Sequence, residues 1–213
     1  KKLKSIKKNY PFLLREMSSE HEVLFSSLSQ NLGIKINKIL EIGTFDGANS
    51  FLLSKIFVNA QIETIDLPHS DKNFKNFYNR KEVVDNFIKN RNNILSKNKN
   101  IHFIEKNSIN LINQEEKYDL IWVDGAHGYP TVCIDIINCL KLIKDDGHIM
   151  VDDIFPSKIK SDEMYDSVAG YETLEELRKA EIINFKLIYK RLDSKNNCEP
   201  KNRKFVALVK KKG

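Results

Sequence analysis

Long apolar segments and paired cysteines are both missing from this sequence. No apolar run approaches the roughly 18 residues of a membrane-spanning helix. Cys133, Cys139 and Cys198 make an odd count without CxxC or Cys/His spacing, which argues against a disulfide framework and a zinc site. Pro11 and Arg15 interrupt the apolar core that a signal peptide would need. We therefore expect a cytoplasmic protein with reduced thiols and no membrane partner.

Acidic residues are absent from both ends of the sequence, where the positive charge collects. The formal net charge is +6, with five lysines in residues 1–8 and six Lys or Arg in residues 201–213. Residues 9–200 are left with a net charge of −5. A nucleic-acid-binding domain usually carries its basic residues on the binding surface itself. Nucleic acid is therefore an unfavoured partner, although basic ends that contact phosphate leave this alternative open.

Apolar periodicity predicts strands and helices in alternation. Short apolar runs predict strands at 39–42, 61–67, 101–108, 118–123, 148–154, 185–192 and 204–211. Helical spacing predicts helices at 18–32, 47–57, 80–97, near 108–114, at 130–143 and near 171–181. Right-handed crossovers make the first five strands parallel, and the last two, without a helix between them, pair as a hairpin at one edge.

The expected fold is α/β: a Rossmann-like, doubly wound, mostly parallel seven-stranded sheet with an antiparallel C-terminal hairpin. We expect one domain over residues 1–213. It divides into an N-terminal helical extension (1–35), a cofactor-binding core (36–155) and a C-terminal helix with the hairpin (156–213).

A glycine turn follows the first strand in the segment ILEIGTFDGANS. Gly43 and Gly47 permit a positive φ or close approach of the backbone to a ligand at a helix N-terminus. A nicotinamide-dinucleotide fingerprint would need glycine where the chain has Phe45 and Ala48, which disfavours a dehydrogenase. Glu41, at the strand end, could pair with a cationic ligand or hold the glycine turn.

Acids also follow three other strands. Asp66 ends the second strand, where a carboxylate can accept hydrogen bonds from ribose hydroxyls. Asp124 follows the fourth strand, and Asp152 and Asp153 end the fifth. These three carboxylates should meet at one edge of the sheet, where their mutual repulsion calls for a cation. Ligation by oxygen alone favours Mg²⁺, with Mn²⁺ or Ca²⁺ as alternatives. His127 stands three residues after Asp124.

Two groups of motifs resemble a known family. LEIGTFDG followed by IETIDL resembles the cofactor motifs of class I S-adenosylmethionine-dependent methyltransferases. DGAHGY and VDD resemble the metal-dependent small-molecule O-methyltransferases, meaning the catechol O-methyltransferase type and bacterial relatives with a DGxHxY signature. The resemblance implies S-adenosylmethionine as cofactor, a divalent cation, and a hydroxylated small molecule such as a sugar or natural-product intermediate as methyl acceptor. The family often has an acid where this chain has Asn107.

The resemblance also assigns roles to residues. It implies cofactor binding by Glu41, Gly43, Thr44, Phe45, Asp46, Gly47, Asn49, Ser50, Asp66, Asn107, Ser108 and Asp124, metal binding by Asp124, Asp152 and Asp153, and catalysis by Asp124 and His127. His127 would take the proton of the acceptor hydroxyl, or would itself bind the metal. The N-terminal helices could pack between the subunits of a homo-oligomer.

Two other functions are consistent with this fold. The first is an RNA methyltransferase, but the chain lacks an Asn-Pro-Pro-Tyr-like tetrad after the fourth strand. The second is a non-catalytic cofactor-binding subunit, which would have no need for three mutually repelling acids.

Overall fold

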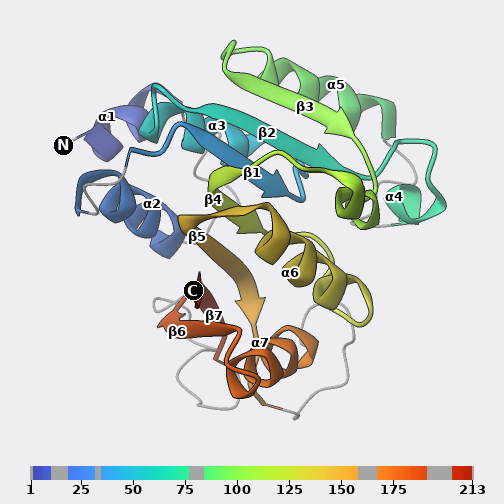
Figure 1. The fold of residues 1–213 in the computed structure, drawn as a ribbon. Helices are drawn as coiled ribbons and strands as arrows, with labels where there is room; N and C mark the ends of the chain where they lie inside the picture. Colours follow the sequence, from blue (N-terminus) through green and yellow to red (C-terminus); the bar gives the residue numbers. More distant parts are fainter. Residues whose placement is uncertain are drawn as a thin grey trace.

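A computed structural model describes residues 2–10, 19–31, 35–76, 84–157, 167–190 and 203–212. The elements in chain order (Figure 1) are α1 (Lys2–Asn9), α2 (Ser19–Asn31), β1 (Lys38–Ile42), α3 (Ala48–Ile56), β2 (Gln61–Asp66), α4 (Lys72–Asn76), α5 (Val84–Leu95), β3 (Ile101–Glu105), η3 (Ser108–Asn113), β4 (Tyr118–Val123), α6 (Thr131–Leu142), β5 (Ile143–Ile154), α7 (Ala169–Lys179), β6 (Ile183–Tyr189) and β7 (Phe205–Lys211). Within these ranges, every helix is too short or too polar to cross a bilayer. The predicted ends of elements at 18, 32, 80 and 191–192, and also Cys198, lie outside the described residues.

The seven strands form one sheet in the order β3-β2-β1-β4-β5-β7-β6. The pairs that join β3, β2, β1, β4 and β5 are parallel, whereas β7 runs antiparallel to both β5 and β6. The predicted parallel sheet with a C-terminal antiparallel hairpin at its edge is confirmed. Strand order reverses between β1 and β4, and ligands of doubly wound sheets bind beyond the carboxyl ends of the strands at such a reversal.

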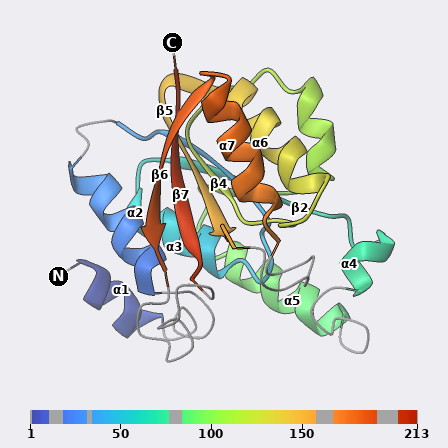
Figure 2. The same ribbon diagram turned by 90° about the horizontal axis from the view of Figure 1, so that it is seen from below.

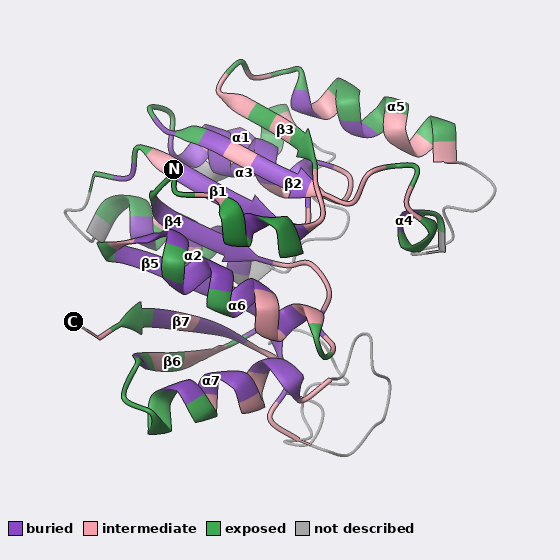
Figure 3. Ribbon diagram, turned by 45° about the vertical axis from the view of Figure 1, so that its right-hand side comes forward, coloured by how far each residue is buried: buried purple, intermediate pink, exposed green. Residues whose placement is uncertain are grey.

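Helices cover both faces of the sheet, and the side chains of β4 show how the two cores are divided. Ile121 and Val123 belong to the core under α6 and α7, whereas Leu120 and Trp122 belong to the core under α2 and α3. This alternation follows from the opposite directions of successive strand side chains. Figure 2 shows the two helical layers on either side of the sheet, and Figure 3 shows that its central strands are buried.

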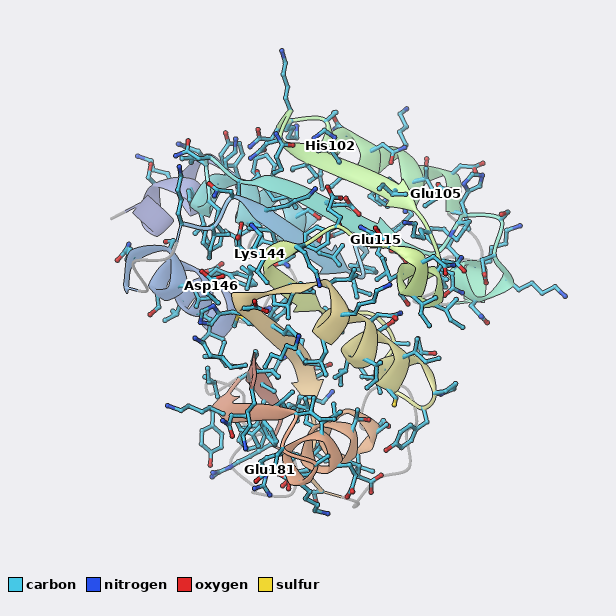
Figure 4. The ribbon with its side chains drawn as sticks, in the orientation of Figure 1. His102, Glu105, Glu115, Lys144, Asp146 and Glu181 are labelled. Carbon is cyan, nitrogen blue, oxygen red and sulfur yellow. The ribbon has the colours of Figure 1, made fainter. Side chains whose placement is uncertain are left out.

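The fifth strand is longer than its sequence indicated. Asp145, Asp146 and Gly147 predict a turn before a strand at 148, but β5 begins at Ile143. Ile143 is buried beside Tyr118 of β4, across a local shift of register. The next pair is Leu120 with His148, so the polar residues 144–147 form an irregularity within the strand. Figure 4 labels Lys144 and Asp146 at this end of β5, far from the carboxyl ends of the strands, and His102 and Glu105 on the edge strand β3.

Asp119 fixes the amino-terminal end of the same region. Its carboxylate accepts hydrogen bonds from the backbone N–H groups of Asn37 and Lys38, both at 2.8 Å, and from Lys144 Nζ at 2.6 Å. One carboxylate therefore connects the starts of β1, β4 and β5. Because these neighbouring strands are parallel, their carboxyl ends also lie side by side.

Candidate active site

The glycine turn after β1 is built around a buried carboxylate. Glu41 is fully buried and accepts hydrogen bonds from Asn49 Nδ2 at 2.7 Å, from Thr64 Oγ1 at 2.5 Å and from the Ser50 hydroxyl. Burial raises its pKa to about 7, although these three hydrogen bonds oppose the increase. Of the two roles open to Glu41, this geometry favours holding the turn over contact with a ligand.

Gly43 brings the end of β1 against the end of β4. Its φ is +97°, and a Cβ at this position would lie 2.2 Å from the carbonyl oxygen of Asp124. Its N–H donates to the carbonyl of Ile65 at 2.9 Å, while Asp124 N–H donates to the carbonyl of Ile42 at 2.8 Å. Only glycine permits this approach, so the turn that would hold a cofactor and the loop that carries Asp124 touch directly.

Asp66 lies at the carboxyl end of β2 with its carboxylate turned toward the same turn. Its two oxygens accept hydrogen bonds from Phe45 N–H at 3.0 Å and Leu67 N–H at 2.8 Å. Asp66 is only half-buried, and it lies at the carboxyl end of β2 beside the glycine turn. It therefore suits a ligand that donates hydroxyl groups, such as a ribose.

The remaining residues predicted for the cofactor fall into two groups. Thr44, Ser50 and Ser108 are buried, whereas Phe45, Asp46, Asn49 and Asn107 are half-buried around the ends of β1 and β3. Asn107 caps η3, because its side chain accepts a hydrogen bond from the N–H of Ile109 at 3.1 Å. Its role in the structure is therefore a helix cap, and contact with an adenine remains a prediction.

The acids after β4 and β5 come together as predicted, but a lysine lies among them. Lys190, just after β6, donates to both carboxylate oxygens of Asp152 and to Oδ1 of Asp153, each at 2.6 Å. Burial alone would raise the pKa of Asp152, but the charge of Lys190 lowers it below its usual range. The same carboxylates raise the pKa of Lys190 against the opposing effect of burial. The cluster is therefore a buried group of ionised partners.

An irregularity in β5 lets two consecutive residues reach one ammonium group. Neighbouring strand residues normally point to opposite faces. Asp153, however, has φ +49°, and the register of β5 against β7 shifts between Val151 and Ile154. This left-handed conformation is costly for a residue other than glycine. Asp153 adopts this conformation at the point where its carboxylate and that of Asp152 both contact Lys190.

His21 and Lys204 complete the surroundings of this pair of acids. His21 Nε2, from α2, lies 3.1 Å from Asp152 Oδ2, and its ring packs edge-on against Trp122. Lys204 Nζ donates to Asp153 Oδ2 at 3.3 Å. Each of the four carboxylate oxygens of Asp152 and Asp153 thus has a lysine nitrogen as hydrogen-bond donor.

His127 and Asp124 lie beside the cluster that Asp152, Asp153 and Lys190 form. His127 Nε2 is 3.7 Å from Asp124 Oδ1 and 3.9 Å from Asp153 Oδ2, and the ring is buried. Burial lowers the pKa of His127 despite the nearby carboxylates. The pKa of Asp124 is raised, first because protein atoms surround its carboxylate and then by the charge of Asp152. About a third of its side chain (33%) is nevertheless exposed, which makes it the most accessible of the three acids.

The positions of Asp124, Asp152 and Asp153 can be compared with what a divalent cation requires. Among the described residues no group of three or more His, Cys, Asp or Glu side chains is placed to hold a metal ion. Asp152 and Asp153 direct their oxygens at Lys190, and a cation bound to them would face that ammonium at close range. As placed, these residues do not fit a metal.

Sequence reasoning did not identify His21, Asp135 or Lys190. His21 shares a helix face with Phe25 and Leu28, so the spacing of these buried residues was the available signal. Asp135 of α6 is buried near Gly125, and burial raises its pKa to about 6. Nothing in the sequence distinguishes Lys190 from the other lysines of its segment.

The core of the chain matches a family model described as a methyltransferase domain. The match covers residues 40–154, just over half of the chain. This range contains the glycine turn, Asp66, Asp124, His127 and both acids of β5. No curated protein matches the sequence.

Solved structures share the fold at low sequence identity. A protein from Staphylococcus aureus, described as a candidate caffeoyl-CoA O-methyltransferase, is 16% identical with a TM-score of 0.63 over 99% of this chain and 92% of its own. The O-methyltransferase TomG from Streptomyces achromogenes, solved with S-adenosylmethionine and involved in tomaymycin synthesis, is 15% identical with a TM-score of 0.60 over 100% and 90%. The methyltransferase PaMTH1 from Podospora anserina, solved with S-adenosylhomocysteine, is 16% identical with a TM-score of 0.61 over 100% and 86%.

The contact between Gly43 and Asp124 can be tested by adding one methyl group. We expect Gly43→Ala to lower the free energy of unfolding by more than about 3 kcal/mol, because the Cβ must displace the backbone of Asp124 and φ is unfavourable. Gly125→Ala is the matched control, since its nearest atom would be at 3.4 Å, and it should cost less than about 1 kcal/mol. Chemical denaturation measures both values; equal losses would contradict the predicted contact.

The buried Glu41 predicts a dependence of stability on pH. Because its pKa is raised from 4.5 to about 7, the folded protein holds this proton more tightly than the unfolded chain. The free energy of unfolding of the wild type relative to Glu41→Gln should therefore fall as pH rises from about 4.5 to about 7, by up to about 3 kcal/mol. Denaturation at several pH values measures this difference, and a constant difference from pH 5 to pH 8 would contradict it.

Proposed function

Since this chain belongs to the methyltransferase-domain family, we propose that it transfers a methyl group from S-adenosylmethionine to a hydroxyl oxygen of a small molecule. Oxygen is proposed as the methylated atom because the buried imidazole of His127 lies at the carboxyl ends of β4 and β5, beside Asp124 and Asp153. An acceptor hydroxyl needs a base at this point, whereas the sulfonium donor needs alignment only.

The cofactor would lie along the carboxyl ends of β1, β2 and β4. Asp66 would accept hydrogen bonds from the ribose hydroxyls, because its half-buried carboxylate lies at the end of β2 beside the glycine turn. Glu41 would act indirectly, by holding the turn through Asn49. When bound, S-adenosylmethionine supplies a methyl group on a positively charged sulfur.

The reaction is a single displacement in which atoms and charge balance. The acceptor oxygen forms a bond to the methyl carbon while the bond from carbon to sulfur breaks, and its electron pair stays on sulfur. His127 takes the hydroxyl proton and becomes an imidazolium, which the neighbouring carboxylates of Asp124 and Asp153 stabilise. S-adenosylhomocysteine and a methyl ether leave, and His127 then returns the proton to water.

The acceptor is proposed to be a small hydroxylated metabolite, a sugar or a natural-product intermediate being the classes the sequence motifs favour. The geometry that supports this choice is the accessible Asp124, which could accept a hydrogen bond from a second hydroxyl next to the reacting one. The proposed reaction does not use the Mg²⁺ expected from the three acids, because Lys190 and Lys204 already neutralise two of them.

Removal of the Asp66 carboxylate should weaken cofactor binding. Hydrogen bonds to charged groups contribute about 1.5–3 kcal/mol each, so Asp66→Ala should raise the dissociation constant for S-adenosylhomocysteine by about 10- to 100-fold. Asp85→Ala, at an exposed position of α5, is the control and should bind as the wild type does. Calorimetric titration measures both. Absence of binding to the wild type would contradict the proposed cofactor itself.

Replacing the base should affect turnover and spare cofactor binding. General-base catalysis contributes about 10²- to 10⁴-fold, so His127→Gln should reduce the methylation rate by that factor. Its affinity for S-adenosylhomocysteine should equal that of the wild type. A variant that retained the full rate on a hydroxylated acceptor would show that His127 is not the base.

A further inference from the structure

We infer that Lys190 is the permanent cation of this site, in the place where a divalent metal would otherwise neutralise the acids after β5. This inference rests on the proposed function, because it concerns the acids next to the proposed base His127. It makes Lys190 a positioning residue that acts through Asp152 and Asp153, and it makes methyl transfer independent of added metal.

Lysine nitrogens already occupy the oxygens that a metal ion would need. Three of the four carboxylate oxygens of Asp152 and Asp153 accept hydrogen bonds from Lys190 Nζ at 2.6 Å. The fourth accepts one from Lys204 Nζ at 3.3 Å. A magnesium ion needs oxygens at about 2.1 Å in near-octahedral geometry. An ion bound to these oxygens would lie within about 5 Å of the Lys190 ammonium, and the two cations would repel each other.

The charges of this cluster also oppose a metal ion. Lys190 and Lys204 match the charges of Asp152 and Asp153, so an added dication would exceed the single charge that Asp124 could contribute. Buried charges are tolerated when they are paired, and an unpaired excess is costly.

Lys190 is deeply buried and held in place. Its side chain is 1% exposed, and its backbone N–H donates to the carbonyl of Lys204 at 3.2 Å. A lysine on the surface could turn into solvent to admit an ion. The ammonium group of Lys190, by contrast, is enclosed by protein and paired with two carboxylates.

The backbone of β5 agrees with this assignment. Asp153 adopts φ +49°, and this conformation occurs where two consecutive acids share one ammonium group. Asp153 in turn lies 3.9 Å from His127 Nε2. Lys190 therefore sets the position of the carboxylate that flanks the proposed base.

Manganese binding tests the inference without reference to any acceptor. Mn²⁺, a paramagnetic substitute for Mg²⁺, is titrated into wild type, Lys190→Met and Lys186→Met, each with S-adenosylhomocysteine, and bound ion is followed by electron paramagnetic resonance. Lys186 is the matched control because it is exposed on β6, four residues away. We expect no specific Mn²⁺ binding to the wild type or to Lys186→Met. Lys190→Met should bind Mn²⁺ with an affinity at least about ten times higher, because it removes one of the two lysines that balance the buried carboxylates.

Two outcomes would overturn the inference. The first is a wild-type protein that binds Mn²⁺ and loses this binding in Asp152→Asn, and the wild-type titration decides this even if Lys190→Met fails to fold. The second is a folded Lys190→Met that gains no affinity for Mn²⁺. Binding of S-adenosylhomocysteine is measured on the same samples, so failure of the cofactor proposal appears separately from failure of the Lys190 assignment.

Discussion

The contact of one ammonium group with two adjacent carboxylates is the interaction on which the carboxyl edge of this sheet depends. Without Lys190, the buried like charges of Asp152 and Asp153 would lose the ammonium group that contacts three of their four oxygens and would keep the contact with Lys204. Removing one partner of such a buried pair typically costs about 3–5 kcal/mol. The contact also links β5 to the C-terminal hairpin, so the segment that closes the sheet contributes the charge that the central strands need.

A second constraint places the proposed cofactor turn next to the acids. Gly43 meets the backbone of Asp124 at a distance that only glycine permits. Glu41 holds the other side of the turn by hydrogen bonds to Asn49 and Thr64. The same strand ends therefore carry a rigid glycine turn, an accessible carboxylate and, three residues further, the imidazole of His127. Methyl transfer needs this kind of alignment more than it needs strong chemical catalysis.

The sequence allowed the sheet to be predicted because its signals are local. Apolar runs, glycine turns and the missing helix between the last two strands predicted the seven strands, the parallel direction of the first five and the antiparallel hairpin, whereas the full order of the strands across the sheet was not predicted. The start of β5 was predicted wrongly, because Asp145-Asp146-Gly147 has the composition of a turn. The partners that keep Ile143 extended lie on β4, more than twenty residues earlier.

The convergence of Asp124, Asp152 and Asp153 follows from strand order, and so it could be predicted from the sequence. What neutralises them could not, because Lys190 lies 37 residues after Asp153 in a lysine-rich segment. Mutual repulsion of three acids indicates that a cation is required and does not say whether that cation is a metal or a side chain. His21 was missed for a similar reason, since a single histidine on an amphipathic helix has no local feature that links it to a site.

The measurement that tests this account most directly is methyl transfer by a metal-depleted protein. S-adenosylmethionine labelled with ¹³C in its methyl group is supplied with a panel of sugars and phenolic metabolites in the presence of a chelator, and the labelled carbon is followed by NMR. The account predicts that a methoxy carbon appears at the same rate with and without Mg²⁺. A methoxy signal that appears only after Mg²⁺ is added, or label transferred to nitrogen or carbon instead of oxygen, would contradict it.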